Sequence, residues 1–311
     1  MQLCPVFPQV FLTILRLFQA GWTAANRFHV HDQQIKQGSA VLLLTGALYA
    51  VSTQAQSLDA PLTFGVVPQL AASELARRWT PVLAYLSEKT GVSIRFGTAP
   101  NIPTFERRLA TGEYDLAYMN PYHYTVFHRK PGYQAVAKEK DRRIQGILVV
   151  RKDSTYQQLE DLQGQTLIFP SPAAFAASVL PRASLAKQGI AFKAKYVASH
   201  ASVYLAVAKG LYPAGGGILR TLAAVEPAVR DQLRILWQTE QYTPHAIAAH
   251  PRLSQAFIER VQQALVMLDQ NPAGRDWLTA LNFKGFVAAR DADWNDVRAL
   301  NITQLEPLIE Q

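Results

Sequence analysis

From residue 61 onward, short apolar runs alternate with segments that carry apolar residues at helical spacing, and proline or glycine stands at most of the junctions. The first run, residues 61–68, closes with Pro68 and precedes helical spacing over residues 71–89. Strands that alternate with helices of about 10 to 15 residues predict mostly parallel sheets covered by helices. The chain is therefore expected to be an α/β protein.

The alternation continues through the first half of the chain, with each helix ended by glycine or by the next apolar run. Thr80-Pro81 has the composition of a helix start, so a second helix is expected from there to Gly91. The other expected elements are strands near residues 93–96, 114–119, 134–137 and 144–151, and helices over 103–110 and 121–130.

The alternation breaks once, where two strands near 134–137 and 144–151 follow each other without a full helix between them. The chain is therefore expected to cross from one lobe to a second. The expected lobes are residues 56–148 with 238–311, and residues 149–237. The second series comprises helices over 156–162, 174–188, 202–209 and 221–233, strands over 165–169, 195–197, 234–237 and 242–249, an apolar stretch at 215–219, and helices from residue 253.

The first 55 residues are interpreted as a targeting segment. From Lys36 a basic residue precedes an apolar run over residues 40–51 and small residues ending at Ala55, which is the layout of a secretory signal peptide. The run is shorter than the roughly 20 residues that a membrane-spanning helix needs. The mature protein is expected to be soluble and periplasmic.

Residues 1–35 precede this signal and are interpreted as an over-extended reading frame. The alternative is that residues 6–18, an apolar stretch interrupted by Arg16, form a membrane-associating helix. The single cysteine, Cys4, lies in the same upstream segment. The mature chain is therefore expected to have no thiol for a disulfide, a metal site or a nucleophile.

The charge pattern argues against a nucleic-acid partner. The net charge is +8, but lysine and arginine occur along the whole chain and at most in short pairs such as Arg77-Arg78. These pairs are interpreted as solvated helix faces. The basic surplus favours an anionic ligand, because it raises the local concentration of anions.

Catalytic motifs are scarce in this sequence. It contains no His-Glu-x-x-His, Gly-x-Ser-x-Gly, Walker-type or Gly-x-Gly-x-x-Gly pattern, so hydrolase, metalloprotease and nucleotide-binding functions lose support. No cofactor and no metal are expected. The glycine run Gly215–Gly217 either cradles an anion through backbone N–H groups or begins a strand that needs small residues, and the second interpretation is favoured.

Two histidines stand where a strand gives way to a helix. His123 lies in Asn120-Pro-Tyr-His-Tyr124, and His200 follows Ser199. Unpaired backbone N–H groups and partial positive charge gather at a helix start, which suits a ligand. The alternative for a lone histidine is a structural or solvated role. Core packing is the alternative for the aromatic cluster of Tyr118, Tyr122 and Tyr124.

Four segments in fixed order resemble the landmarks of periplasmic substrate-binding proteins of phosphate, phosphite and phosphonate ABC transporters. The resemblance covers nearly all of residues 61–270. It implies the type II periplasmic-binding fold, in which two α/β lobes joined by crossing strands close around a ligand and pass it to an ABC importer. The matching segments are residues 79–91, 112–121, 159–164 and 181–190, and Ser199-His200 with an Ala-Val-x-x-Gly helix at 206–210 continues the match.

The ligand-binding residues agree less well with this family. A Ser-Thr-Ser run that opens a second-lobe helix in the family is matched by Ala174-Phe175-Ala176, so the hydroxyls are missing. An aspartate after the Ala-Val helix is matched by Pro213, and a tyrosine of the first-lobe motif is matched by Met119. A pocket without these groups is not expected to recognise a phosphonate as its relatives do.

The first hypothesis is a monomeric solute-binding protein that delivers a small oxyanionic ligand to an ABC transporter permease. The second is a periplasmic sensor of the same fold that partners a membrane histidine kinase. An exported enzyme is the third, without a nucleophile and base to support it. Ligand contacts are expected from Pro68, Gln69, Tyr118, Asn120, Tyr122, His123, Ser171, Ala174, Phe175, Ala176, Ser178, Ser199 and His200.

Overall fold

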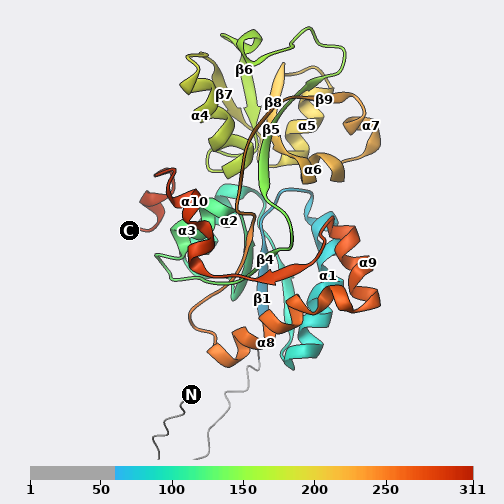
Figure 1. The fold of residues 1–311 in the computed structure, drawn as a ribbon, viewed down its shortest axis with the longest axis vertical. Helices are drawn as coiled ribbons and strands as arrows, with labels where there is room; N and C mark the ends of the chain where they lie inside the picture. The colour runs from blue at the N-terminus through green and yellow to red at the C-terminus, as the bar shows by residue number, and fades with distance from the viewer. Residues whose placement is uncertain (1–59, 311) are drawn as a thin grey trace, which may run out of the picture. The chain divides into compact units, whose positions relative to one another are not determined.

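The computed structural model describes residues 60–310, which form two sheets with helices on both sides of each (Figure 1). The expected upstream extension and signal peptide, residues 1–55, lie outside the described residues. The six-stranded sheet with its helices is called the first lobe, and the five-stranded sheet with its helices the second lobe. The two-lobed α/β fold expected from the sequence is confirmed.

The sheet of the first lobe has the strand order β11-β4-β10-β3-β1-β2. Helices α1, α8 and α9 lie on one side of it, and α2, α3 and α10 lie on the other (Figure 1). The strands are Leu62–Val66 (β1), Ile94–Gly97 (β2), Leu116–Met119 (β3), Gln134–Glu139 (β4), Ala246–Ala249 (β10) and Phe286–Ala288 (β11). The helices are Ala72–Thr90 (α1), Ile102–Ala110 (α2), Pro121–Phe127 (α3), Gln255–Val266 (α8), Pro272–Leu281 (α9) and Asn295–Arg298 (α10).

The sheet of the second lobe has the order β7-β6-β8-β5-β9. Its strands are Ile144–Arg151 (β5), Thr166–Phe169 (β6), Lys193–Tyr196 (β7), Ala214–Ile218 (β8) and Leu233–Tyr242 (β9). The helical elements are the π-helical turn Phe175–Val179 (η2), Leu180–Lys187 (α4), His200–Ala208 (α5), Leu219–Ala224 (α6) and Pro227–Arg230 (α7). Both central strands, β5 and β8, are apolar and buried along almost their whole length, as expected for a sheet covered on both faces.

The chain crosses between the lobes twice, at residues 140–143 and at residues 243–245. Strands next to a crossing pair antiparallel with their neighbours, as in β4–β10 and β5–β8, whereas β1–β2 and β6–β8 pair parallel. Each sheet is therefore mixed rather than mostly parallel, because strands that enter after a crossing run in the opposite direction. The expected lobe boundaries after residues 148 and 237 fall inside β5 and β9, which belong whole to the second sheet.

Helix α1 is continuous where the sequence predicts a second helix from Thr80-Pro81. Trp79, Val82 and Leu86 form one buried face that runs past the proline. Burying large apolar side chains contributes about 1.5–3 kcal/mol each, which offsets a cost of about 3 kcal/mol for an interior proline. The predicted helix boundary was therefore wrong, because tertiary burial overrides the local signal.

Other expected elements are shorter or divided. Residues 156–162 form only a 3-10 turn, Leu159–Leu162, and the helix expected over 221–233 is divided into α6 and α7 just before Pro227. The strand expected over 242–249 is interrupted at Pro244, which has no N–H for a ladder hydrogen bond. Strand β11 was not expected.

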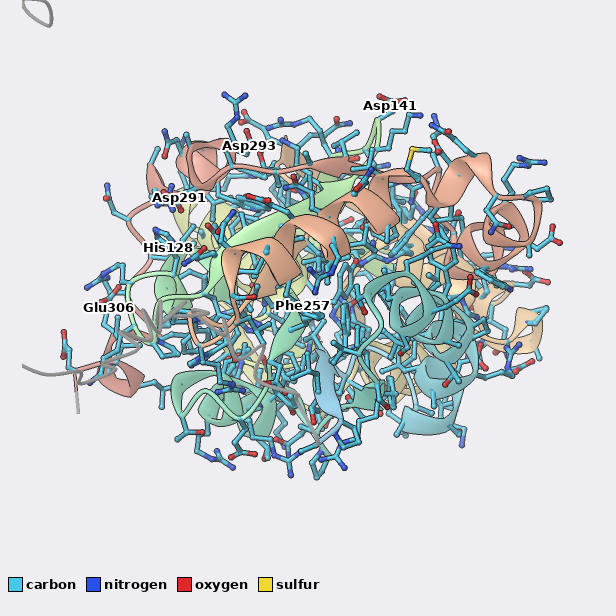
Figure 2. The ribbon with its side chains drawn as sticks, turned by 90° about the horizontal axis from the view of Figure 1, so that it is seen from below. His128, Asp141, Phe257, Asp291, Asp293 and Glu306 are labelled. Carbon is cyan, nitrogen blue, oxygen red and sulfur yellow. The ribbon has the colours of Figure 1, made fainter. Side chains whose placement is uncertain are left out.

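The C-terminal segment, residues 286–310, packs back on the first lobe. Asp291 lies 3.3 Å from His128 Nε2, and Glu306 pairs with Arg129 at 2.7 Å. Figure 2 shows His128, Asp291 and Glu306 along this edge of the molecule. These contacts join the segment to the end of α3, so both ends of the described chain belong to the first lobe.

Two buried glycines allow the turn η2 to rest directly on the second sheet. A Cβ atom on Gly146 would lie 2.0 Å from the carbonyl oxygen of Ala176, and one on Gly216 would lie 1.9 Å from that of Ala177. Only glycine permits so close an approach of one backbone to another. The favoured interpretation of Gly215–Gly217, a strand that needs small residues, is therefore confirmed, and the glycines position η2.

We expect Gly216→Ala to destabilise the protein by about 2 kcal/mol or more, because the added methyl group forces η2 away from β8. Urea unfolding measures this change. Gly189→Ala is the control, because Gly189 has φ +74° but open space around its Cβ position. Its loss of stability should be limited to the cost of placing alanine in the left-handed conformation, about 1–2 kcal/mol. Equal losses in the two variants would contradict the close-approach argument.

Candidate functional site

The lobes meet where η2 faces the first lobe. Residues 173–177 and Ile218 of the second lobe belong to the same buried cluster as the core of the first lobe. The side chain of Asn120 donates to the Ala173 carbonyl at 3.4 Å. Within the second lobe, the Phe175 ring meets the Tyr242 ring edge-on, with centroids 5.5 Å apart. The start of η2 is therefore part of the contact between the lobes.

A small cavity of about 10 Å³ remains at this contact. It has about the smallest volume that holds one water molecule, so a larger ligand requires the lobes to separate and the walls to rearrange. No carboxylate is among its lining residues. These residues are Val67, Gln69, Ile102, Asn120, Ile144, Ala174, Phe175, Ala176, Ala177, His200, Ile218 and His245.

Backbone N–H groups at the start of η2 provide hydrogen-bond donors at this cavity. Ser178 is the first residue of the turn whose N–H bonds back within it, to the Ala174 carbonyl at 2.7 Å. The N–H groups of Phe175, Ala176 and Ala177 precede that bond and lack an intrahelical acceptor, as first-turn groups do. The turn therefore offers donors to a ligand although its side chains carry no hydroxyl at these three positions.

Arg220, on α6, reaches from the second lobe into the first. Its guanidinium pairs with the buried carboxylate of Glu139 and lies over the rings of Tyr118 and Phe283, at 5.6 and 5.2 Å from the centroids. The Tyr118 hydroxyl donates to the same Glu139 oxygen at 3.0 Å. Arg220 also donates to Gln69 Oε1 at 3.3 Å. One arginine thus joins the two lobes beside the cavity.

Two buried imidazoles face the cavity from opposite lobes. Burial lowers the pKa of His200 to about 3, with a further contribution from Arg220, and the same two causes hold the pKa of His245 well below its usual value. His200 Nδ1 lies 3.2 Å from the Thr221 hydroxyl, and His245 stacks on Tyr118 with centroids 4.9 Å apart. Both imidazoles are therefore neutral in the folded protein at neutral pH.

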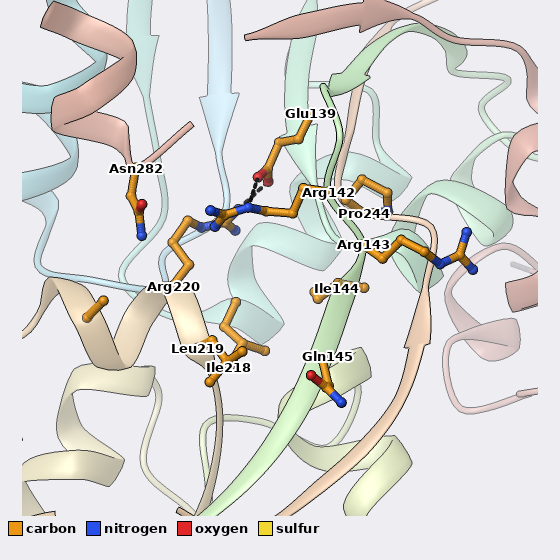
Figure 3. Close-up of a pocket in the computed structure, with 11 residues that line it drawn as sticks. Glu139, Arg142, Arg143, Ile144, Gln145, Ile218, Leu219, Arg220, Pro244 and Asn282 are labelled. Carbon is orange, nitrogen blue, oxygen red and sulfur yellow. Dashed lines mark hydrogen bonds and ion pairs between the residues drawn. The ribbon is translucent and has the colours of Figure 1, made fainter. Parts of the chain in front are cut away.

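A larger cavity of about 380 Å³ lies beside the two crossings (Figure 3). Arg142 and Arg143 come from the first crossing, Pro244 from the second, and Arg220 from α6. Arg143 is paired with Asp296 at 2.6 Å. Because walls of this cavity come from both lobes, its shape depends on their separation.

Six of the residues predicted from the sequence line the small cavity together, and these are Gln69, Asn120, Ala174, Phe175, Ala176 and His200. Tyr118 lies behind them against His245 and Glu139. Pro68, Ser171, Ser178 and Ser199 are neighbours in sequence that do not line this cavity, and Ser199 caps α5 by accepting from the Ser202 N–H. The hydroxyls of Ser171 and Ser178 are buried without a hydrogen-bond partner.

Two predicted residues point elsewhere. His123 is fully buried with its Nε2 2.9 Å from Glu106, in the core of the first lobe. The Tyr122 hydroxyl accepts from the Leu305 N–H at 2.8 Å and so holds the C-terminal segment. For both side chains the structure favours a structural role in the core over contact with a ligand.

Sequence reasoning missed His245, Arg220 and Glu139. His245 follows Pro244, and that proline is a signal that the strand expected over 242–249 ends there and that a crossing begins. Arg220 follows the buried strand β8 at a helix start, the same placement that singled out His123 and His200. Pairing between Arg220 and Glu139, 81 positions apart, has no local signal.

Comparison with known proteins agrees with this geometry. The model of a family described as periplasmic substrate-binding proteins of phosphonate ABC transporters matches residues 64–294. The chain belongs to this family. The phosphate-import protein PhnD of Mycolicibacterium smegmatis is 22% identical over 245 residues, which cover 68% of this chain and 73% of that protein.

Solved structures of the same kind share the fold. A binding component of an ABC phosphonate transporter from Pseudomonas aeruginosa has a TM-score of 0.72 at 18% identity, covering 78% of this chain and 86% of that one. PhnD1 from Prochlorococcus marinus, in complex with methylphosphonate, has a TM-score of 0.70 at 20% identity, covering 77% and 98%. None of these relatives supports a membrane kinase as the partner.

Members of this family are periplasmic proteins that bind substrates for transport. Within residues 60–310, no helix is long and apolar enough to cross a membrane. The same residues contain no cluster of three or more histidine, cysteine or acidic side chains that could hold a metal ion.

We expect the protein to lose stability as the pH falls below about 6.5. In the unfolded chain His200 takes up a proton near that pH, whereas in the folded protein the buried imidazole stays neutral down to about pH 3. At pH 5 this group alone accounts for about 2 kcal/mol, at 1.36 kcal/mol per pH unit. Urea unfolding of the parent and of His200→Gln at pH 7.5 and pH 5 measures the difference. Identical losses in both proteins would contradict the assignment of this pH dependence to His200.

Proposed function

We propose that this protein binds a small oxyanion between its lobes and delivers it to an ABC importer. The observation that carries the proposal is the donor-rich character of the cavity: the N–H groups of η2 are free of intrahelical acceptors, and no carboxylate lines the walls. The side-chain oxygens of Gln69 and Asn120 are already occupied, by Arg220 and by the His123 N–H. Such a site suits a ligand that brings acceptors and negative charge.

The apolar walls set the proposed ligand apart from those of the relatives. Phe175 is 1% exposed and stands where the family has a hydroxyl residue, and Ile102, Ile144 and Ile218 surround it in the cavity lining. A ligand of this chain would combine an oxyanion for the η2 amides with an apolar part against these side chains. The protein is proposed to act as a monomer without catalytic activity, exported by the segment from Lys36 to Ala55.

We expect an oxyanion ligand to raise the melting temperature, because binding to the folded state stabilises it by about 2.7 kcal/mol at a hundredfold excess over Kd. Thermal shift with phosphate, phosphite, methylphosphonate, sulfonates, arsenate and small carboxylates, each at millimolar concentration, tests this. Phosphonates should give the weakest shifts of the panel, because the three hydroxyl positions are absent. A panel without any shift would remove the oxyanion proposal.

The triple variant Ala174→Ser, Phe175→Thr, Ala176→Ser should gain methylphosphonate or phosphite binding. Each hydrogen bond from a restored hydroxyl to a charged group contributes about 1.5–3 kcal/mol, and loss of the buried Phe175 ring provides room. Titration calorimetry measures the gain, and the oxyanion that binds the parent best should bind the variant less tightly.

Ala173→Ser is the matched control, because it adds a hydroxyl one residue before the set that lines the cavity. It should leave the affinities of the parent unchanged. If the triple variant and the parent bind the same oxyanion equally tightly, the start of η2 does not contact the ligand.

A further inference from the structure

A chain of hydrogen bonds leads from Arg220 to His245 through the side-chain amide of Gln69. Arg220 lies in the second lobe, whereas Gln69 follows β1 and His245 stands at the end of the second crossing. The guanidinium nitrogen Nη2 of Arg220 lies 3.3 Å from Gln69 Oε1, and Gln69 Nε2 lies 3.1 Å from His245 Nε2. The three side chains thus form a directed series.

The direction of this series follows from the chemistry of its first member. A guanidinium group has only donors, so the atom of Gln69 that faces Arg220 must be the amide oxygen. The amide nitrogen then faces His245, and an amide nitrogen also only donates. His245 Nε2 must therefore accept, which leaves the single proton of the neutral imidazole on Nδ1.

The Nδ1 atom of His245 is buried and has no hydrogen-bond partner among the described residues. His245 is 1% exposed and lines the small cavity between the lobes. A buried donor without an acceptor is costly, by about as much as a lost hydrogen bond, unless something supplies the acceptor. The cavity is where a ligand would supply it.

Arg220 is held in place independently of Gln69. Its ion pair with Glu139 and its position over the rings of Tyr118 and Phe283 fix the guanidinium on the first lobe. The arrangement exists only while the lobes are in contact, because α6 and Glu139 belong to different lobes.

We propose that Arg220 is a positioning residue which, when the lobes meet, fixes His245 as an Nδ1–H donor toward an acceptor atom of the ligand. The part of this proposal that concerns a ligand rests on the proposed function, whereas the assignment of the His245 tautomer rests only on the hydrogen bonds from Arg220 through Gln69. The ligand would then receive hydrogen bonds from both lobes, from the η2 amides on one side and from His245 on the other. This arrangement requires at least two acceptor oxygens on different sides of the ligand.

Nitrogen NMR of the 15N-histidine-labelled protein tests the proposal without a ligand, since long-range proton–nitrogen spectra distinguish a protonated Nδ1 from a protonated Nε2. His245→Gln identifies the signals by their loss. In the parent, His245 should carry its proton on Nδ1. In Arg220→Met, the side-chain amide of Gln69 is free to flip and can accept from His245. The ratio of the Nε2–H to the Nδ1–H tautomer of His245 should then rise roughly tenfold or more, which corresponds to the loss of one hydrogen bond.

Arg142→Met is the matched control. Arg142 also stands beside Glu139, at 3.8 Å, but makes no contact with Gln69. Its loss should leave the His245 tautomer as in the parent. An equal change in both arginine variants would assign the effect to local charge and overturn the proposal.

Gln69→Glu provides a second test, which does not depend on how Arg220→Met folds. A carboxylate beside Arg220 remains ionised and has no donor, so His245 must place a proton on Nε2 instead. In this variant the spectra should therefore show a proton on Nε2 of His245, which carries none in the parent. A parent protein with Nε2–H, or a Gln69→Glu variant that keeps an unprotonated Nε2, would overturn the proposal even if an oxyanion binds.

Discussion

The ion pair between Arg220 and Glu139 is the interaction on which the contact between the lobes depends. Taking two charges out of water costs several kcal/mol for each ion, and mutual attraction alone does not always offset that cost. Here one carboxylate oxygen accepts from Tyr118 as well as from Arg220, and Gln69 accepts from the guanidinium, whereas the other oxygen of Glu139 is buried without a hydrogen-bond partner. A buried ion pair of this kind adds little net stability but restricts the geometry of the groups around it. It therefore sets the register in which η2 meets the first lobe.

Most of the fold could be predicted from the sequence, because its elements are encoded locally. Strand β1 ends at the proline-bounded loop where it was expected, α1 ends at Gly91 in the left-handed conformation, and β4 and β5 follow each other without a helix. The errors arise where burial or position in a sheet decides instead. Pro81 stays inside α1 because apolar side chains on both sides of it are buried together, and β11 becomes a strand only because β4 offers it an edge.

The candidate site could be predicted only in part, for the same physical reason. Asn120, Phe175 and His200 stand at helix starts, and a helix start is recognisable from neighbouring residues. Arg220 and His245 also have local signals, a helix start and a preceding proline, but their contacts with Glu139 and Gln69 join positions far apart in the chain and cannot be read from neighbouring residues. His123 is the opposite case: it has the local pattern of a ligand-binding residue, but its Nε2 lies 2.9 Å from Glu106 on the neighbouring helix α2, in the core of the first lobe.

The two crossings make the second lobe an insertion within the first. Strand β10, which is formed only after residues 144–242, lies at the centre of the first sheet, between β3 and β4. The first lobe therefore cannot complete its own sheet until nearly the whole chain exists, and its central pairings close loops of more than a hundred residues. Pairings between such distant segments slow folding, because the entropy of loop closure must be lost before the contacts form. The second lobe differs in this respect, because residues 144–242 supply all of its strands and can complete their sheet before the first lobe does.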